Sequence, residues 1–204
     1  MNNIISALEI AVIIILPLIV FYKKNKIGAK TYVKNVILIY LIWYLTYAFF
    51  HEVSHLAGAW ALGLNINDYQ LIPKIWEGEF GNAYISTQYN NSIQEFITDV
   101  MSYFRDFILL IIGFVILKRF KISSVFLFGL TIVLLILSPL YDVFNNYFAF
   151  VLGYLNDFNG MSHYAGNFGA HTIGISITLV GLIVTSWFLF SKKLNKDYFN
   201  LNPG

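Results

Sequence analysis

Five long apolar segments constrain the fold of this chain more than any other feature of its sequence. By hydropathy they cover approximately residues 4–22, 35–62, 100–117, 123–152 and 170–190. About 20 apolar residues are enough for a helix to cross a bilayer. Because 58% of the 204 residues are hydrophobic and only 12% are charged, the composition is far from that of a soluble domain. The sequence therefore predicts an all-α membrane protein, a polytopic bundle of about five transmembrane helices.

A single membrane-embedded domain is expected to account for residues 1–204. The longest polar stretch, roughly residues 64–99, is too short for a separate globular domain of ordinary size. The first apolar segment is predicted to be a span and not a signal peptide, because no positive charge precedes it and Lys23 and Lys24 follow it. We expect an integral, multi-pass protein of the cell membrane, with the lipid bilayer as its constant partner.

The lack of cysteine and the small net charge exclude cysteine-based metal sites and argue against nucleic-acid binding. The chain has no cysteine, so disulfides and thiolate metal ligands are absent, and any metal must be held by histidine and carboxylate. The net charge is only +2, and no basic tract is mixed with aromatic residues. Nucleic acid is therefore not an expected partner.

Positive charges predict the orientation in the membrane. Lysine and arginine gather in residues 23–34, 118–121 and 192–196, whereas the charged side chains of residues 63–99 are acidic except for Lys74. Loops rich in lysine and arginine stay in the cytoplasm. The pattern predicts an outside N-terminus and a cytoplasmic C-terminus.

The loop after the second apolar segment is predicted to hold short strands. Residues 65–86 alternate apolar and polar side chains around Gly78 and Gly81, which is typical of a hairpin or small sheet at the membrane surface. Two interpretations stay open. The segment is either a surface loop with a few extended residues, or an exposed edge that pairs with an unfolded substrate strand.

The motif HEVSH, residues 51–55, lies within the second apolar segment. Residues four apart share one face of a helix, so His51 and His55 can offer two ring nitrogens to one ion, with Glu52 beside them. Ionisable groups at the bilayer centre cost ~2.5–3.5 kcal/mol each on insertion scales, so they are retained only when paired or bound. The motif predicts a Zn²⁺ site in which Glu52 acts as the general base.

Two histidines hold zinc poorly, so a third ligand is required. Asp142, Asp157, His163 and His171 are the candidates away from the water-facing loops. Asp142 is favoured, because His51 and Asp142 both lie ~24–28 Å along spans that run in the same direction. Asp157 is the alternative, and would reach the ion only if the chain turns back into the membrane.

Pro139 is expected to break the long segment 123–152 next to Asp142. Asn145, Asn146 and Asn156 are candidates for contacts with the ligands or with substrate. The alternative for Asn145 and Asn146 is hydrogen bonding between helices.

Arg105 and Asp106 are adjacent in the third apolar segment. They are expected to anchor this segment at the membrane interface and not to act as a catalytic pair.

These residues resemble the site-2 protease family of intramembrane zinc metalloproteases, over roughly residues 35–175. The likeness rests on HExxH in a membrane helix, the strand-bearing loop after it, and an Asp in a later helix that contains proline. The family's usual second motif, Asn and Pro followed by Leu-Asp-Gly, is not complete, since "SPLYDVFNN" keeps Pro and Asp and "NDFNG" keeps an Asp near a Gly. The chain resembles a compact, divergent branch of the family more closely. In that branch a glycine follows HExxH by eight residues, and Gly63 has this position here. In this family the HExxH helix usually runs in the opposite direction, with zinc nearer the cytosol.

The resemblance implies a zinc metalloendopeptidase that cleaves a membrane protein or peptide substrate. No regulatory domain is evident, so regulation would come from a membrane partner or from trimming of the substrate. Two alternatives stay open. One is a transporter or channel that uses the His and Asp residues as a path for metal ions or protons; the other is a catalytically silent membrane scaffold.

Overall fold

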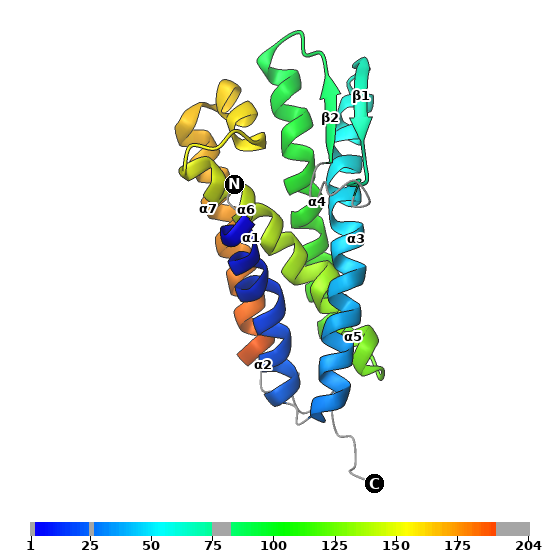
Figure 1. Ribbon diagram of the computed structural model, residues 1–204. Coiled ribbons are helices and arrows are strands. Elements are labelled where there is room, and N and C mark those ends of the chain that lie inside the picture. Colours follow the sequence, from blue (N-terminus) through cyan, green and yellow to red (C-terminus); the bar gives the residue numbers. More distant parts are fainter. Residues whose placement is uncertain (1–2, 25–26, 75–82, 191–204) are drawn as a thin grey trace.

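The computed structural model describes residues 3–24, 27–74 and 83–190 (Figure 1). In chain order the elements are α1 (Asn3–Ile10), η1 (Ala11–Ile15), α2 (Leu16–Lys24), α3 (Ala29–Ala61), β1 (Ile66–Gln70), β2 (Tyr84–Thr87), α4 (Ser92–Arg119), α5 (Val125–Ile132), η3 (Val133–Leu137), α6 (Ser138–Val151) and α7 (Asp157–Phe190). The elements η1 and η3 are π-helical turns. The sequence predictions for Gly78, Gly81, Lys26 and residues 192–196 lie outside the described residues.

Four of the described helical segments are long and apolar enough to cross a membrane. They are α3, α4, α7 and the continuous segment Val125–Val151, which combines α5, η3 and α6. The expected first span corresponds to α1, η1 and α2, three short helical segments that follow one another along the same side of the bundle (Figure 1). The helical-bundle fold is thus confirmed, and its apolar helices agree with a membrane protein.

Pro139 does not break its helix. The chain stays helical from Val125 to Val151 and accommodates the proline by widening into the π-helical turn η3 just before it. In this turn the Ser138 N–H donates to the Val133 carbonyl, five residues back. A proline cannot donate to the residue four positions before it, and a wider turn relieves that conflict without an exit from the helix.

The two predicted strands are present. β1 and β2 form an antiparallel sheet in which Ile66 pairs with Thr87 and Gln70 pairs with Tyr84. The sheet lies beside the end of α3 and the start of α4 (Figure 1). Gly63, with φ of 64°, ends α3 in the left-handed region that favours glycine and turns the chain toward β1.

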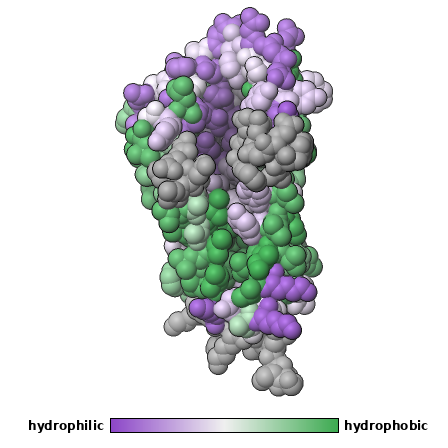
Figure 2. Space-filling model, in the orientation of Figure 1, coloured by the Kyte–Doolittle hydropathy of each residue, from purple (hydrophilic) through white to green (hydrophobic). Residues whose placement is uncertain are grey.

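The bundle is polar at one end and apolar below it. Figure 2 shows hydrophilic side chains around the strands and along a hollow in the upper half, and a hydrophobic belt beneath. Inside that belt an aromatic cluster joins three elements: the ring centroid of Phe21 lies 5.0 Å from that of Phe128 and 4.8 Å from that of Phe188. The HEVSH motif therefore lies between the polar end and the apolar part of the bundle.

The charge pattern predicts which end faces the cytoplasm. A cysteine that replaces Asn90, before α4, should react with a membrane-impermeant maleimide in intact cells, whereas one that replaces Lys30, at the start of α3, should react only after permeabilisation. The absence of native cysteine removes background labelling. Labelling of position 30 but not of position 90 in intact cells would show the reverse orientation, which the family resemblance implies.

Candidate metal centre

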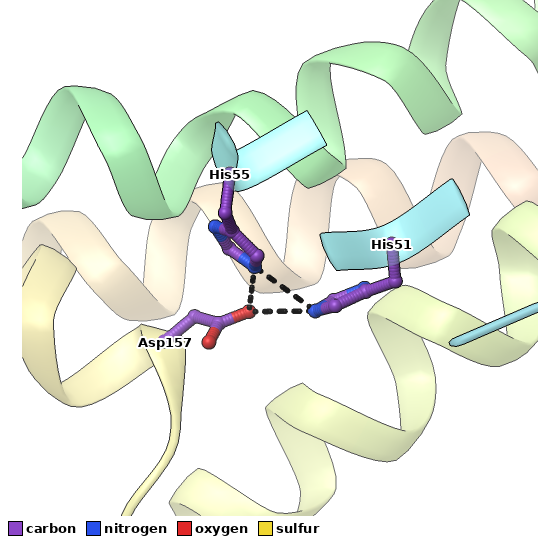
Figure 3. Close-up of side chains that lie close together, drawn as sticks. All are labelled: His51, His55 and Asp157. Atoms are coloured by element: carbon purple, nitrogen blue, oxygen red, sulfur yellow. Dashed lines mark hydrogen bonds and ion pairs between the residues drawn. The ribbon is translucent and has the colours of Figure 1, made fainter. Parts of the chain in front are cut away.

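Three side chains from two distant parts of the chain converge at the polar end of the bundle. His51 and His55 project from α3, and Asp157 is the first residue of α7 (Figure 3). The two Nε2 atoms are 3.0 Å apart, and each lies 3.3 Å from Asp157 Oδ2. The side chains are 12%, 8% and 22% exposed. This compact triangle of donor atoms could hold a metal ion.

The size of the triangle fits zinc. Donor atoms bound tetrahedrally at about 2.0–2.1 Å must lie about 3.3–3.4 Å from one another. The observed separations of 3.0, 3.3 and 3.3 Å are close to that requirement. Three protein ligands leave the fourth tetrahedral position open, as in catalytic zinc sites.

The hydrogen bonds of the two rings also favour a cation. His51 Nδ1 lies 2.8 Å from Asp142 Oδ2, and His55 Nδ1 lies 2.9 Å from the Thr98 carbonyl oxygen. A carbonyl and an ionised carboxylate only accept, so each Nδ1 carries a proton and donates it. In neutral rings both Nε2 lone pairs then point at each other and at a carboxylate oxygen. That arrangement is repulsive unless a metal ion lies between them or one Nε2 also carries a proton, and three donor atoms that converge in this way suit a metal ion.

Asp142 orients His51 and does not join the triangle. From the sequence Asp142 is the favoured third ligand, but both of its oxygens are engaged on the far side of the ring. Oδ1 accepts from Tyr47 at 2.8 Å and from Asn146 at 3.0 Å, and Oδ2 accepts from His51 and from Arg105. Asp142 lies at the same depth in the bundle as His51, as expected. Its side chain, however, contacts Nδ1 of His51 and not Nε2, the atom that faces the triangle.

Asp157 reaches the triangle because the chain reverses after α6. Gly153, with φ of 81°, lies in the short connection, and α7 then starts at Asp157. Asn156 holds this start in place: its Oδ1 accepts from the Phe158 N–H, and its Nδ2 donates to the Asn146 carbonyl at 2.6 Å. Tyr103 donates to Asp157 Oδ2 at 2.9 Å. The alternative ligand from the sequence is therefore the one that the geometry favours.

The structure corrects the expectation for Arg105 and Asp106. The two residues are not an interfacial anchor, because Asp106 is 1% exposed and Arg105 Nη2 lies 2.6 Å from both Asp106 Oδ1 and Asp142 Oδ2. Arg105 thus supplies the positive charge that a carboxylate buried among apolar helices needs. An arginine inside an apolar segment is by itself a signal of function, and the sequence offers it.

The other candidates lie away from the triangle. His163 is exposed and its Nδ1 donates to Glu95 Oε2 at 2.9 Å, and His171 contacts the Tyr147 hydroxyl at 3.0 Å. Asn145 donates to Glu9 of α1, an interhelical contact, whereas Asn146 contacts Asp142. Of the three asparagines, Asn146 and Asn156 therefore support the site and Asn145 ties α1 to α6.

A cavity of about 190 Å³ opens beside the triangle. Its walls come from α3, β2, the start of α4 and the start of α7, and they comprise Glu52, His55, Ala83, Tyr84, Ile85, Tyr89, Thr98, Asp99 and Asp157. Burial raises the pKa of the Tyr89 phenol, and the negative charges of Asp99 and Glu95 raise it further, so this wall group stays protonated at neutral pH. Glu52, His55 and Asp157 thus line the same cavity as the start of β2.

Comparison with protein-family models, curated proteins and solved structures finds no match to this chain. The geometry of the described residues is therefore the basis on which a function can be assigned.

Zinc content distinguishes the roles of the two aspartates. Asp157→Ala should leave the purified protein without zinc, because it removes one of three ligands, whereas Asp142→Ala should weaken zinc affinity by about 10–100-fold without emptying the site at saturating zinc. Elemental analysis of zinc per chain in detergent, followed by a zinc titration, measures both. His163→Ala is the control and should keep its zinc. Stoichiometric zinc in the Asp157 variant would exclude Asp157 as a ligand.

Arg105 should be necessary for stability as well as for the site. Arg105→Met leaves the buried Asp142 carboxylate without its counter-charge, a change that costs about 3–5 kcal/mol when one partner of a buried pair is removed. We expect a lower thermal midpoint in detergent and weaker zinc binding. Arg119→Met, at the exposed end of α4, should change neither measurement. Equal midpoints for the two variants would contradict the role given to Arg105.

Proposed function

We propose that this chain is an intramembrane zinc-dependent endopeptidase that hydrolyses a peptide bond of a membrane-associated protein or peptide. One observation carries the proposal: two members of the donor triangle, His55 and Asp157, line the same cavity as Glu52. A site of this kind needs three ligands, an open position and a nearby base.

Each residue has a distinct role in this proposal. His51, His55 and Asp157 would hold zinc, which, when bound, polarises the scissile carbonyl and makes water easier to deprotonate. Glu52 takes the proton from the attacking water and passes it to the leaving amine. Asp142 and the Thr98 carbonyl keep Nδ1 of each histidine protonated and each Nε2 directed at the ion.

The β2 strand supports a peptide as the substrate. Residues 83–85, at the start of β2, form one wall of the cavity, so an extended backbone segment lies beside the site. A protease acts on extended peptide, and an extended segment can add to a free strand edge through main-chain hydrogen bonds. Of the two interpretations that the sequence leaves open for this loop, the proposal adopts the substrate-binding edge.

The apolar core beneath the site favours hydrolysis over transport. A transport path would have to continue from the His and Asp residues through the membrane, along polar groups or water. Below the site the described helices are packed with Trp43, Ile136, Leu137 and Tyr141, which are at most 6% exposed. The polar cavity instead opens toward the strand-bearing end of the bundle (Figure 2).

Replacement of Glu52 tests the proposal. Glu52→Gln should retain stoichiometric zinc and the wild-type melting midpoint, because the two side chains are nearly isosteric, but it should slow cleavage of a membrane-embedded test substrate at least ~10²-fold because an amide cannot accept the proton. Cleavage is measured by gel and mass spectrometry with the zinc-loaded protein in detergent.

Two results would count against the enzyme. Cleavage by Glu52→Gln at the wild-type rate would remove Glu52 from the mechanism. Absence of cleavage by the zinc-loaded wild type, together with zinc uptake into sealed vesicles that depends on His51, would favour transport.

A further inference from the structure

Asp99 is an acidic group on the cavity wall that the proposed mechanism does not use. It lies on α4 and lines the cavity together with Glu52 and Asp157. Among residues 3–24, 27–74 and 83–190, no hydrogen bond or ion pair to its carboxylate is present. Its neighbour on the same helix, Glu95, differs in this respect, because its Oε2 atom contacts His163 at 2.9 Å. Asp99 is therefore a half-buried carboxyl group on the cavity wall, without a partner among the described residues.

A glycine makes room for this carboxylate beside the metal site. Gly160 follows Asp157 by one helical turn, and a Cβ atom there would collide with Asp99 Oδ2. The carboxylate thus lies directly against the first turn of α7. Any larger residue at position 160 would push Asp99 away from the wall that it now forms.

Thr98 adds a second polar group that lacks a partner. It lines the same cavity, is 2% exposed, and its Oγ1 makes no hydrogen bond in the described structure. A buried hydroxyl without a partner costs about 1–3 kcal/mol, so such a group is retained where something else satisfies it. A ligand that donates hydrogen bonds would satisfy both Thr98 Oγ1 and Asp99.

The charge balance of the cavity indicates the sign of that ligand. With zinc in place, two positive charges face the three carboxylates of Glu52, Asp99 and Asp157. Zinc compensates Asp157 and Glu52, and Asp99 is left over. Among the described residues that line the cavity, none is a lysine or an arginine. The Asp99 carboxyl group is therefore available to a cation that the substrate brings.

We propose that Asp99 and Thr98 form a subsite for a cationic group of the substrate, either a lysine or arginine side chain close to the scissile bond or a free N-terminal amine. The inference rests on the proposed peptidase function and names the substrate class of the same cavity. The carboxylate forms the ion pair, and the Thr98 hydroxyl accepts a second hydrogen bond from the same group.

Cleavage-site profiling tests the subsite. The zinc-loaded wild type in detergent is given a peptide library with acetylated N-termini, and cut bonds are read by mass spectrometry. Lysine and arginine should be enriched about tenfold or more at one position near the cut bond, as expected for a hydrogen bond to a charged group. Asp99→Asn should still cut but lose the enrichment, Asp99→Glu should retain part of it, and Glu95→Gln, the matched control, should retain all of it.

A second library separates the two sources of positive charge. Its lysines are acetylated and its N-termini are free. Cuts at a fixed distance from the N-terminus, abolished by Asp99→Asn, would assign the subsite to the amine. The subsite would be overturned if cuts in the first library show no preference for basic residues and cuts in the second lie at no fixed distance from the N-terminus. The peptidase proposal would then remain intact.

Binding without turnover keeps the subsite testable if cleavage fails. Zinc-loaded Glu52→Gln should bind an acetylated peptide with one lysine about tenfold more tightly than the same peptide with norleucine, and Asp99→Asn in that background should remove the difference. Equal affinities for the two peptides would overturn the subsite whether or not the wild type cuts. A preference for lysine in binding, without cleavage by the wild type, would support the subsite and refute the peptidase.

Discussion

The hydrogen bond between Asp142 and His51 is the interaction on which the rest of the site depends. It joins α6 to α3 in the interior of the bundle, and Arg105 of α4 shares the same carboxylate oxygen. Three helices therefore meet at one buried charge. Because the bond fixes the proton on Nδ1, it also fixes the direction of the Nε2 lone pair toward His55 and Asp157. This one contact thus links the packing of the three helices to the orientation of the His51 ring.

Much of this architecture could be predicted from the sequence, because apolar segments and helical periodicity are local signals. The HEVSH motif places both histidines on one helical face, and residue spacing is enough to see it. The strands after α3 follow from alternation and glycine. The helical segments, the sheet and the pairing of His51 with His55 all appear in the structure.

The third ligand could not be predicted in the same way, because it depends on how the chain reverses between α6 and α7. Residue counts along a span indicate depth, and at that depth Asp142 is indeed close to His51. They do not indicate which way a side chain points, nor that Gly153 and Asn156 return Asp157 to the same level. The π-helical turn before Pro139 changes that direction as well, since it adds a residue to one turn of the helix. The subsite of Asp99 and Thr98 could not be predicted from the sequence for a related reason. It depends on their position in the cavity wall and on the lack of hydrogen-bond partners for their side chains in the described structure.

The separation of the ligands along the chain has a consequence for biosynthesis. His51 and His55 emerge from the ribosome about a hundred residues before Asp157, and α7 is the last helix that the structure describes. A nascent chain with only its earlier spans inserted holds two histidines and lacks the carboxylate that completes the triangle. A metal ion that needs all three groups could bind only once α7 is in place. The three candidate donor groups therefore come together only after α7 has been made and has packed against the earlier helices.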